Sequence, residues 1–154
     1  MKNGSYYLNS KYISYYFFPV FVFIFAAIAV VIIFPGQKET VLDGIFSREQ
    51  ANRGNLIYSM YCLECHGDKL QGGGTFIPTL SGIDFTANWK RQSLDNLFSY
   101  LVEFMPLDSP RSLTPQEYVD VLSYILEYNG YPHGKEELPP VRTELKRLRF
   151  VPIH

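Results

Sequence analysis

The chain has 154 residues, with 14 Lys and Arg against 15 Asp and Glu, and a formal net charge of −1. This length suits one ordinary domain and an appendage. A charge close to zero excludes the usual nucleic-acid binder, whose domain would be clearly basic.

Residues 17–34 form an apolar run without a charged residue. As a helix this run would span roughly 27 Å, enough for the hydrocarbon core of a bilayer. Residues 1–16 contain Lys2, Lys11 and no acid, and this bias predicts that they lie in the cytoplasm. We therefore expect a transmembrane anchor at 17–34 that contacts lipid, with residues from 35 onward outside.

A cleaved signal peptide is the alternative for this segment. Ala27-Ile28-Ala29 is similar to a cleavage site, but it lies inside the apolar run. Cleavage there would leave residues 30–34 as an exposed apolar end, so we favour the uncleaved anchor.

Residues 35–46 combine Pro, Gly and mixed charge, and predict a linker. Ser47 and Gln50 have the spacing of a capping box, which predicts a helix from Arg48 to about Tyr61. Gly54 within it costs about 1 kcal/mol relative to alanine, and so indicates a close helix crossing.

The motif Cys62-Leu63-Glu64-Cys65-His66 follows directly and contains both cysteines of the chain. C-x-x-C-H is the attachment pattern of c-type haem. Each cysteine can form a thioether with one vinyl group of the porphyrin, and the adjacent histidine can bind the iron. The motif predicts one covalent haem c held by Cys62 and Cys65, with His66 as the proximal axial ligand.

Two other uses of the cysteine pair remain open. A structural zinc ion takes four ligands, and only His133 and His154 are further candidates. A redox dithiol would open a helix within a βαβ pattern and would need no histidine.

Haem attachment in bacteria also implies a location outside the cytoplasmic membrane, on its periplasmic side.

Residues 67–88 show no sustained periodicity and predict a long loop. The triple glycine at 72–74 is no phosphate cradle, because it lacks the G-K-[ST] sequence and a preceding strand. We interpret these glycines as turns that let the backbone pass close to the cofactor. A loop of this length is usually functional, and covering one face of the haem would explain it.

Two more helices are predicted. The first opens at Ser93 and ends before Pro106; its buried face is expected to contain Leu94, Leu97, Phe98, Leu101 and Val102. The second begins with the capping box Thr114 to Glu117 and ends at Gly130. No alternating β-branched run occurs, so the fold class is all-α with long connecting loops.

A sixth ligand for the iron should come from the opposite side. Met60 lies on the helix that enters the motif, so we expect it not to reach that side. Met105 lies in a turn after a helix, where Pro106 fixes the backbone, and it is the candidate axial ligand. His133 is the rival ligand, and a five-coordinate iron is the remaining alternative.

Residues 140–154 form a basic, Pro-containing tail. We expect a solvated or strap-like extension. A docking segment for an acidic partner is the alternative.

Residues 47–139 resemble class I cytochromes c. The resemblance lies in the helix with Gly54 and Tyr58, the motif Cys62–Gly67, Ile77-Pro78-Thr79-Leu80, Phe104-Met105-Pro106 and the last helix. It implies the cytochrome c fold, three main helices plus long loops around a covalent haem, here with one N-terminal transmembrane helix. It also implies that the Pro78 carbonyl accepts a hydrogen bond from the proximal imidazole, and that Gly54 and Tyr124 meet where two helices cross.

Shorter motifs around Trp89, Met105, Thr114 and Leu138 are similar to cytochromes that serve quinoprotein (PQQ) dehydrogenases. The expected haem pocket also includes Pro78, Leu80, Trp89, Arg91 and Pro106. Trp89, with Lys90 and Arg91, either faces the haem propionates or is a core tryptophan beside two solvated charges.

Together these features predict a single-pass protein of the bacterial inner membrane whose monohaem domain lies in the periplasm. We expect one-electron transfer and no substrate chemistry. The partners would be a dehydrogenase or quinol-oxidising complex and a terminal oxidase or reaction centre. The alternatives are a fixed haem subunit of a respiratory, photosynthetic or dehydrogenase complex, and a haem sensor with a labile sixth ligand.

Overall fold

The computed structural model describes residues 38–153. The predicted N-terminal segment 1–16, the predicted membrane span 17–34 and His154 lie outside the described residues. Among residues 38–153, each helix is too short or too polar to cross a bilayer.

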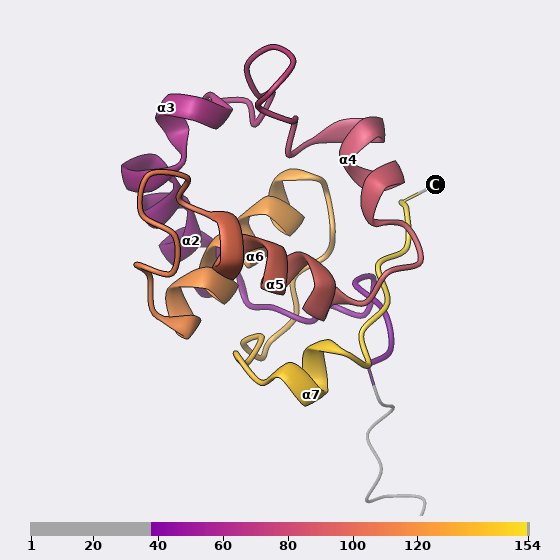
Figure 1. Ribbon diagram of the computed structural model, residues 1–154. Helices are drawn as coiled ribbons and strands as arrows, with labels where there is room; N and C mark the ends of the chain where they lie inside the picture. Colours follow the sequence, from indigo (N-terminus) through magenta and orange to yellow (C-terminus); the bar gives the residue numbers. More distant parts are fainter. Residues whose placement is uncertain (1–37, 154) are drawn as a thin grey trace, which may run out of the picture. The chain divides into compact units, whose positions relative to one another are not determined.

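Six helices make up this part of the chain (Figure 1). They are α2 (Arg48–Tyr61), α3 (Leu63–His66), α4 (Gly82–Trp89), α5 (Leu94–Phe104), α6 (Pro115–Tyr128) and α7 (Arg142–Leu145). Residues 38–153 contain isolated β-bridges but no strand. The prediction of an all-α domain is therefore confirmed for the described residues.

Helices α2 and α6 cross in close contact at Gly54. A β-carbon at this position would lie 1.9 Å from the carbonyl oxygen of Asp120 and 2.9 Å from the β-carbon of Tyr124. One turn further along α2, the rings of Tyr58 and Tyr124 are 5.2 Å apart. The predicted crossing of Gly54 with Tyr124 is confirmed.

The start of α2 differs from the predicted capping box. Ser47 accepts a hydrogen bond from the Gln50 backbone, as expected. The Gln50 side chain, however, does not return to Ser47. It is fully buried, donates to the Leu138 carbonyl (2.9 Å) and accepts from the Leu138 N–H (2.7 Å). Gln50 thus satisfies both backbone groups of a distant buried residue, which the local pattern could not indicate.

The capping box at α6 forms in full. The Glu117 N–H donates to the Thr114 hydroxyl (3.2 Å), and the Thr114 N–H donates to the Glu117 carboxylate (2.7 Å). This reciprocal arrangement satisfies two N–H groups at the helix start.

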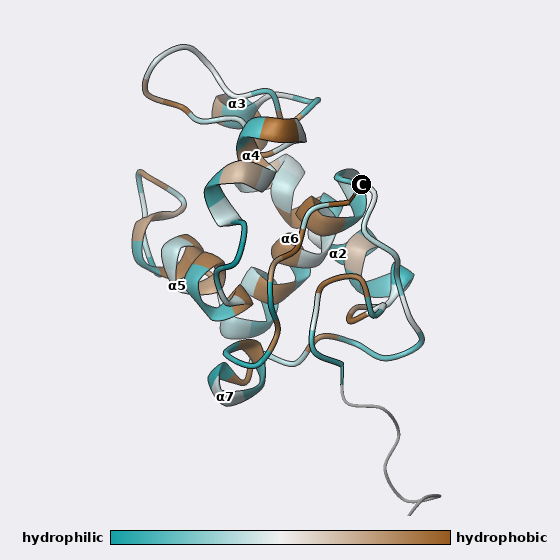
Figure 2. Ribbon diagram, turned by 90° about the vertical axis from the view of Figure 1, so that its right-hand side faces the viewer, coloured by the Kyte–Doolittle hydropathy of each residue, from teal (hydrophilic) through white to brown (hydrophobic). Residues whose placement is uncertain are grey.

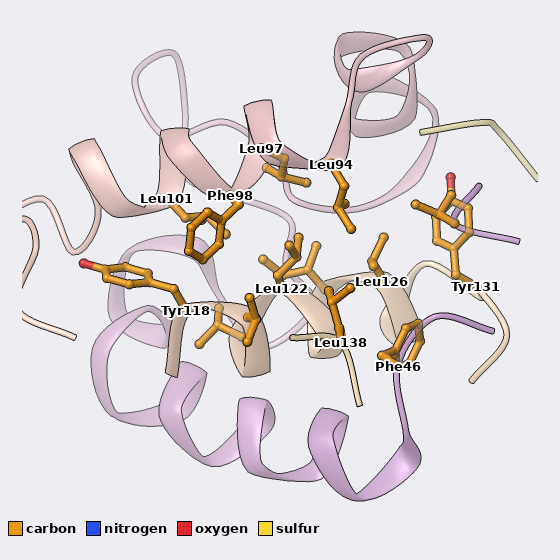
Figure 3. Packing of buried hydrophobic residues seen from close by; sticks show 14 of the residues in the cluster. Phe46, Leu94, Leu97, Phe98, Leu101, Tyr118, Leu122, Leu126, Tyr131 and Leu138 are labelled. Carbon is orange, nitrogen blue, oxygen red and sulfur yellow. The ribbon is translucent and has the colours of Figure 1, made fainter. Parts of the chain in front are cut away.

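Part of the core lies between α5 and α6 (Figure 3). Leu97, Phe98 and Leu101 of α5 point toward α6, where Tyr118 and Leu122 face them. The predicted apolar face of α5 is buried, apart from Val102, which is partly buried. These contacts hold α5 in place, and Met105 follows directly at its end.

Two predicted boundaries are too narrow. Within the predicted linker 35–46, Val41 and Phe46 are fully buried, and within the predicted tail 140–154, Leu145 and Phe150 are buried as well. The linker and the tail therefore contribute to the same core as residues 47–139. In the sequence these apolar residues stand between charged ones and only weakly indicate a buried segment. In the fold they are removed from water, which stabilises the domain.

Residues 142–151, which we call the C-terminal strap, hold the junction between α4 and α5. The Leu94 N–H donates to the Leu148 carbonyl (2.9 Å), and the Arg91 N–H donates to the Phe150 carbonyl (2.9 Å). The strap-like extension expected for the tail is therefore observed.

The prediction of a loop over residues 67–88 is also corrected, because residues 82–88 belong to helix α4. The remaining loop is anchored by Leu70, which is fully buried and has a positive φ of 55°. Gly72 makes the tight turn, since a β-carbon there would lie 2.3 Å from the Ile77 carbonyl oxygen. The close approach at Gly72 is thus to the chain's own backbone.

Candidate functional site

A cavity of about 900 Å³ opens beside the cysteine motif. Its walls come from the end of α2, α3, residues 76–80, and helices α4, α5 and α6. Figure 2 shows hydrophobic segments on α4, α5 and α6, and most of the lining side chains are apolar or aromatic. The volume lies within the range of about 300–1,000 Å³ that is typical of cofactor pockets.

The three chemically important residues of the motif all line this cavity. Cys62 is the cap residue between α2 and α3, and the single turn of α3 brings Cys65 and His66 to the same cavity. Burial is the main cause that raises the pKa of the Cys62 thiol to about 11, and the nearby Cys65 adds a smaller contribution. This thiol therefore keeps its proton at neutral pH and is a poor nucleophile without assistance.

The His66 imidazole is buried and oriented by Pro78. Its Nδ1 lies 3.2 Å from the Pro78 carbonyl oxygen. Because a carbonyl only accepts, Nδ1 carries the proton and Nε2 keeps a free lone pair. Burial lowers the pKa of His66, although the hydrogen bond to Pro78 acts in the opposite direction. The neutral ring is thus prepared to bind a metal through Nε2.

Met105 lies at the C-terminal end of α5, half-buried, and lines the cavity together with Pro106. The Tyr118 hydroxyl donates to the Met105 carbonyl (2.7 Å) and fixes this turn. Met60 also lines the cavity, but from the helix that enters the motif, and its side chain is 67% exposed.

The rival ligand His133 is not among the residues that line the cavity. Its ring lies on the surface, with Nε2 2.6 Å from the Arg48 guanidinium. The geometry therefore favours Met105 over His133 as a donor toward this cavity.

The remaining predicted pocket residues divide into two groups. Pro78, Leu80, Trp89 and Pro106 line the cavity, whereas Arg91 does not. The backbone of Arg91 bonds to the C-terminal strap, and among the described residues no Lys or Arg belongs to the lining. Arg91 is therefore not placed as a pocket residue, whereas Trp89 is.

Sequence reasoning missed several aromatic residues of this cavity. Tyr58 lines it and donates to the Gly67 carbonyl (2.7 Å), which ties α2 to the loop after the motif. Phe76, Phe85 and Tyr100 line it as well. The aromatic share of 16% was the available signal.

Within residues 38–153 the other uses of the cysteine pair lack their structural requirements, and the zinc candidate His154 lies outside this range. Among residues 38–153, no group of three His, Cys, Asp or Glu residues is placed to hold a metal ion. The absence of strands in the same range also removes the βαβ context of a redox dithiol.

A cavity of this size, with two thiols, an oriented neutral imidazole and a thioether in its walls, fits a covalently bound haem and is the site of a c-type cytochrome domain. A family model described as "Cytochrome C oxidase, cbb3-type, subunit III" matches residues 49–125, half of the chain, and the chain belongs to this family. The match covers α2 to α5 and most of α6, and it implies haem-based electron transfer through a covalent haem c. Comparison with curated proteins and with solved structures gives no match.

Proposed function

We propose that the chain is a membrane-anchored monohaem cytochrome. It would transfer single electrons between a dehydrogenase or quinol-oxidising complex and a terminal acceptor. The observation that carries the proposal is the meeting of Cys62, Cys65, His66 and Met105 in the wall of one cavity. When bound, a haem supplies an iron that cycles between the ferric and ferrous states.

The residues of the chain have separate roles in this proposal. Cys62 and Cys65 would hold the porphyrin through thioethers, and His66 and Met105 would supply ligands to the iron. Two protein ligands kept in both oxidation states would make the reorganisation on electron transfer small, and the Met105 side chain would raise the reduction potential. Buried apolar side chains such as Phe85 and Leu101 exclude water from the pocket.

The rim of the cavity supports electron exchange with a protein partner. Met60, Tyr61, Phe76 and Leu107 line the cavity and are also exposed, Phe76 at 93% and Leu107 at 76%. Exposed apolar groups of this size are typical of interaction sites. A partner that binds these side chains would lie next to the edge of the haem.

The anchor and the location are part of the same proposal. They are supported by the uncharged run at 17–34 and by the lysines before it. These features favour a single span of the bacterial inner membrane, with the haem domain in the periplasm.

A second candidate is a fixed haem subunit of a larger membrane complex. The description of the matching family, which names an oxidase subunit, favours it. Gentle solubilisation separates the two candidates, because a free carrier migrates alone and a subunit migrates with its complex. Rapid binding of CO to the reduced native protein would instead favour a haem sensor.

Attachment of haem is the decisive test. The full chain is produced in a bacterium that matures c-type cytochromes, denatured, and extracted with acidified organic solvent. We expect the pigment to stay with the wild-type chain and to be lost from the double variant Cys62→Ser, Cys65→Ser. Colourless wild-type protein, or pigment that passes into the solvent, would contradict the proposal.

A further inference from the structure

Asn129, at the C-terminal end of α6, uses its side-chain amide to hold a loop of the haem site. Its Nδ2 donates to the Leu80 carbonyl (2.9 Å) and to the Ile125 carbonyl (2.8 Å). Its Oδ1 accepts from the Gly82 N–H (2.9 Å). The half-buried amide thus joins α6 to the chain on both sides of Ser81.

The loop that Asn129 holds is otherwise bonded mainly to itself. The Gly72 N–H donates to the His66 carbonyl (2.9 Å), and the Leu80 N–H donates to the Leu70 carbonyl (2.8 Å). Thr79 also donates to the Leu70 carbonyl (3.1 Å). Among the described residues, Asn129 is the only residue outside 66–81 whose side chain forms a hydrogen bond with residues 70–81. Asn129 therefore links the Leu80 end of this loop to α6, while Tyr58 links its Gly67 end to α2.

The loop carries the carbonyl that orients the proximal imidazole. Pro78, whose oxygen lies 3.2 Å from His66 Nδ1, is two residues before Leu80. Only Thr79 separates Pro78 from Leu80, so we expect a displacement of Leu80 to shift the Pro78 carbonyl as well. A weaker bond at Nδ1 makes the imidazole a weaker electron donor to the iron.

We propose that Asn129 is a positioning residue that holds the Pro78 carbonyl against His66 and so helps to set the reduction potential of the haem iron. This inference rests on the proposed haem-binding function. Asn129 itself does not line the cavity. It acts through the Leu80 carbonyl, the loop and the His66 ring.

The test uses the full haem-loaded chain and two readouts, the reduction potential and the exchange rate of the His66 Nδ1–H in the ferrous protein. Asn129→Ala should raise the potential, because the ferric state loses donation from the imidazole. It should also speed the exchange of this proton about tenfold, the effect of losing a buried hydrogen bond.

A second variant removes the donor to Leu80 and to Ile125 and adds a negative charge. Asn129→Asp is nearly isosteric and can still accept from the Gly82 N–H, but its carboxylate cannot donate to Leu80. We expect faster exchange of the His66 proton here too. This variant carries the test if Asn129→Ala does not fold.

Tyr131→Phe is the control for a merely structural loss. It removes the bond from the Tyr131 hydroxyl to the Val151 carbonyl (2.9 Å), which does not involve the loop. It should leave both readouts close to wild type. The inference is overturned if Asn129→Ala changes the two readouts no more than Tyr131→Phe does. It is also overturned if the exchange rate of the His66 proton rises only as much as the exchange rates of the backbone amides of α2 and α6. Failure of the proposed function would appear earlier, as wild-type protein without attached pigment.

Discussion

Gly54 on α2 lies so close to Asp120 on α6 that a β-carbon on the glycine would be 1.9 Å from the aspartate carbonyl oxygen. This oxygen belongs to a helix backbone and cannot rotate away. The two helices can therefore approach this closely only because residue 54 has no side chain.

The first prediction follows from this contact. Overpacking costs about 1–3 kcal/mol and occasionally more, whereas alanine gains about 1 kcal/mol of helix propensity over glycine. Because the backbone oxygen cannot move away, we take the upper end of this cost, about 3 kcal/mol. After the gain in propensity is subtracted, Gly54→Ala should lower the free energy of unfolding by about 2 kcal/mol, measured by chemical denaturation. Asn55→Ala, at an exposed neighbouring position, should be close to neutral. Equal stability of the two variants would show that the helices can separate without cost.

The second prediction concerns the sixth ligand. Met105→Ala should leave the pigment attached through Cys62 and Cys65, lower the reduction potential and admit CO to the ferrous iron. Met60→Ala is the matched control, because Met60 lines the same cavity from the motif side. Optical spectra and a redox titration check both variants. An unchanged spectrum in Met105→Ala would reject this ligand assignment.

The third prediction is a pH dependence at Asp43. The N–H groups of Thr40 (2.8 Å) and Glu39 (2.9 Å) donate to its carboxylate and lower its pKa below the ordinary value of 3.8. A depressed folded-state pKa gives stability above about pH 4 that is lost as the pH falls through the folded-state value. Wild type should therefore be more stable than Asp43→Asn at pH 7, and the difference should close in acid.

Urea denaturation at a series of pH values measures this difference. Asp68→Asn is a suitable control, because Asp68 is exposed and has no side-chain hydrogen bond within the described residues. A gap between wild type and Asp43→Asn that persisted unchanged at pH 2 would rule out the carboxylate charge as its origin.

The fourth prediction concerns the C-terminal strap. Phe150 is 1% exposed, and its ring lies 5.8 Å from Phe85 and 5.3 Å from Tyr131. Phe150→Ala should cost about 3–5 kcal/mol. It should also loosen Phe85, which lines the cavity, and so broaden the haem spectrum. Thermal unfolding with Arg147→Ala as an exposed control measures the loss, and equal melting temperatures would contradict the role of the strap.

The sequence was sufficient for the elements whose signals are local. The range predicted for α2 agrees with the structure, and α5 and α6 were recognised because apolar residues recur along one face and caps stand at their ends. Cys62, Cys65 and His66 were identifiable because the chemistry of attachment requires that spacing. Met105 was singled out because few other residues could supply a second ligand.

The features that sequence reasoning missed depend on contacts between distant residues. Gln50 has a capping-box position, yet its amide bonds to Leu138. Helix α4 has only eight residues and begins at a glycine, so it has little periodicity. Phe150 lies in a basic stretch, and only the fold shows that it is buried. Arg91 is close to Trp89 in sequence, but its backbone turns toward the strap.

The C-terminal strap also has a consequence for biosynthesis. Cys62 and Cys65 leave the ribosome long before Leu148 and Phe150, which back the α4–α5 junction and Phe85. Until those later residues arrive, one wall of the pocket has no support behind it. The strap is therefore the last part of the pocket's support to be synthesised, and the wall at Phe85 is complete only once the C-terminal segment has packed against it.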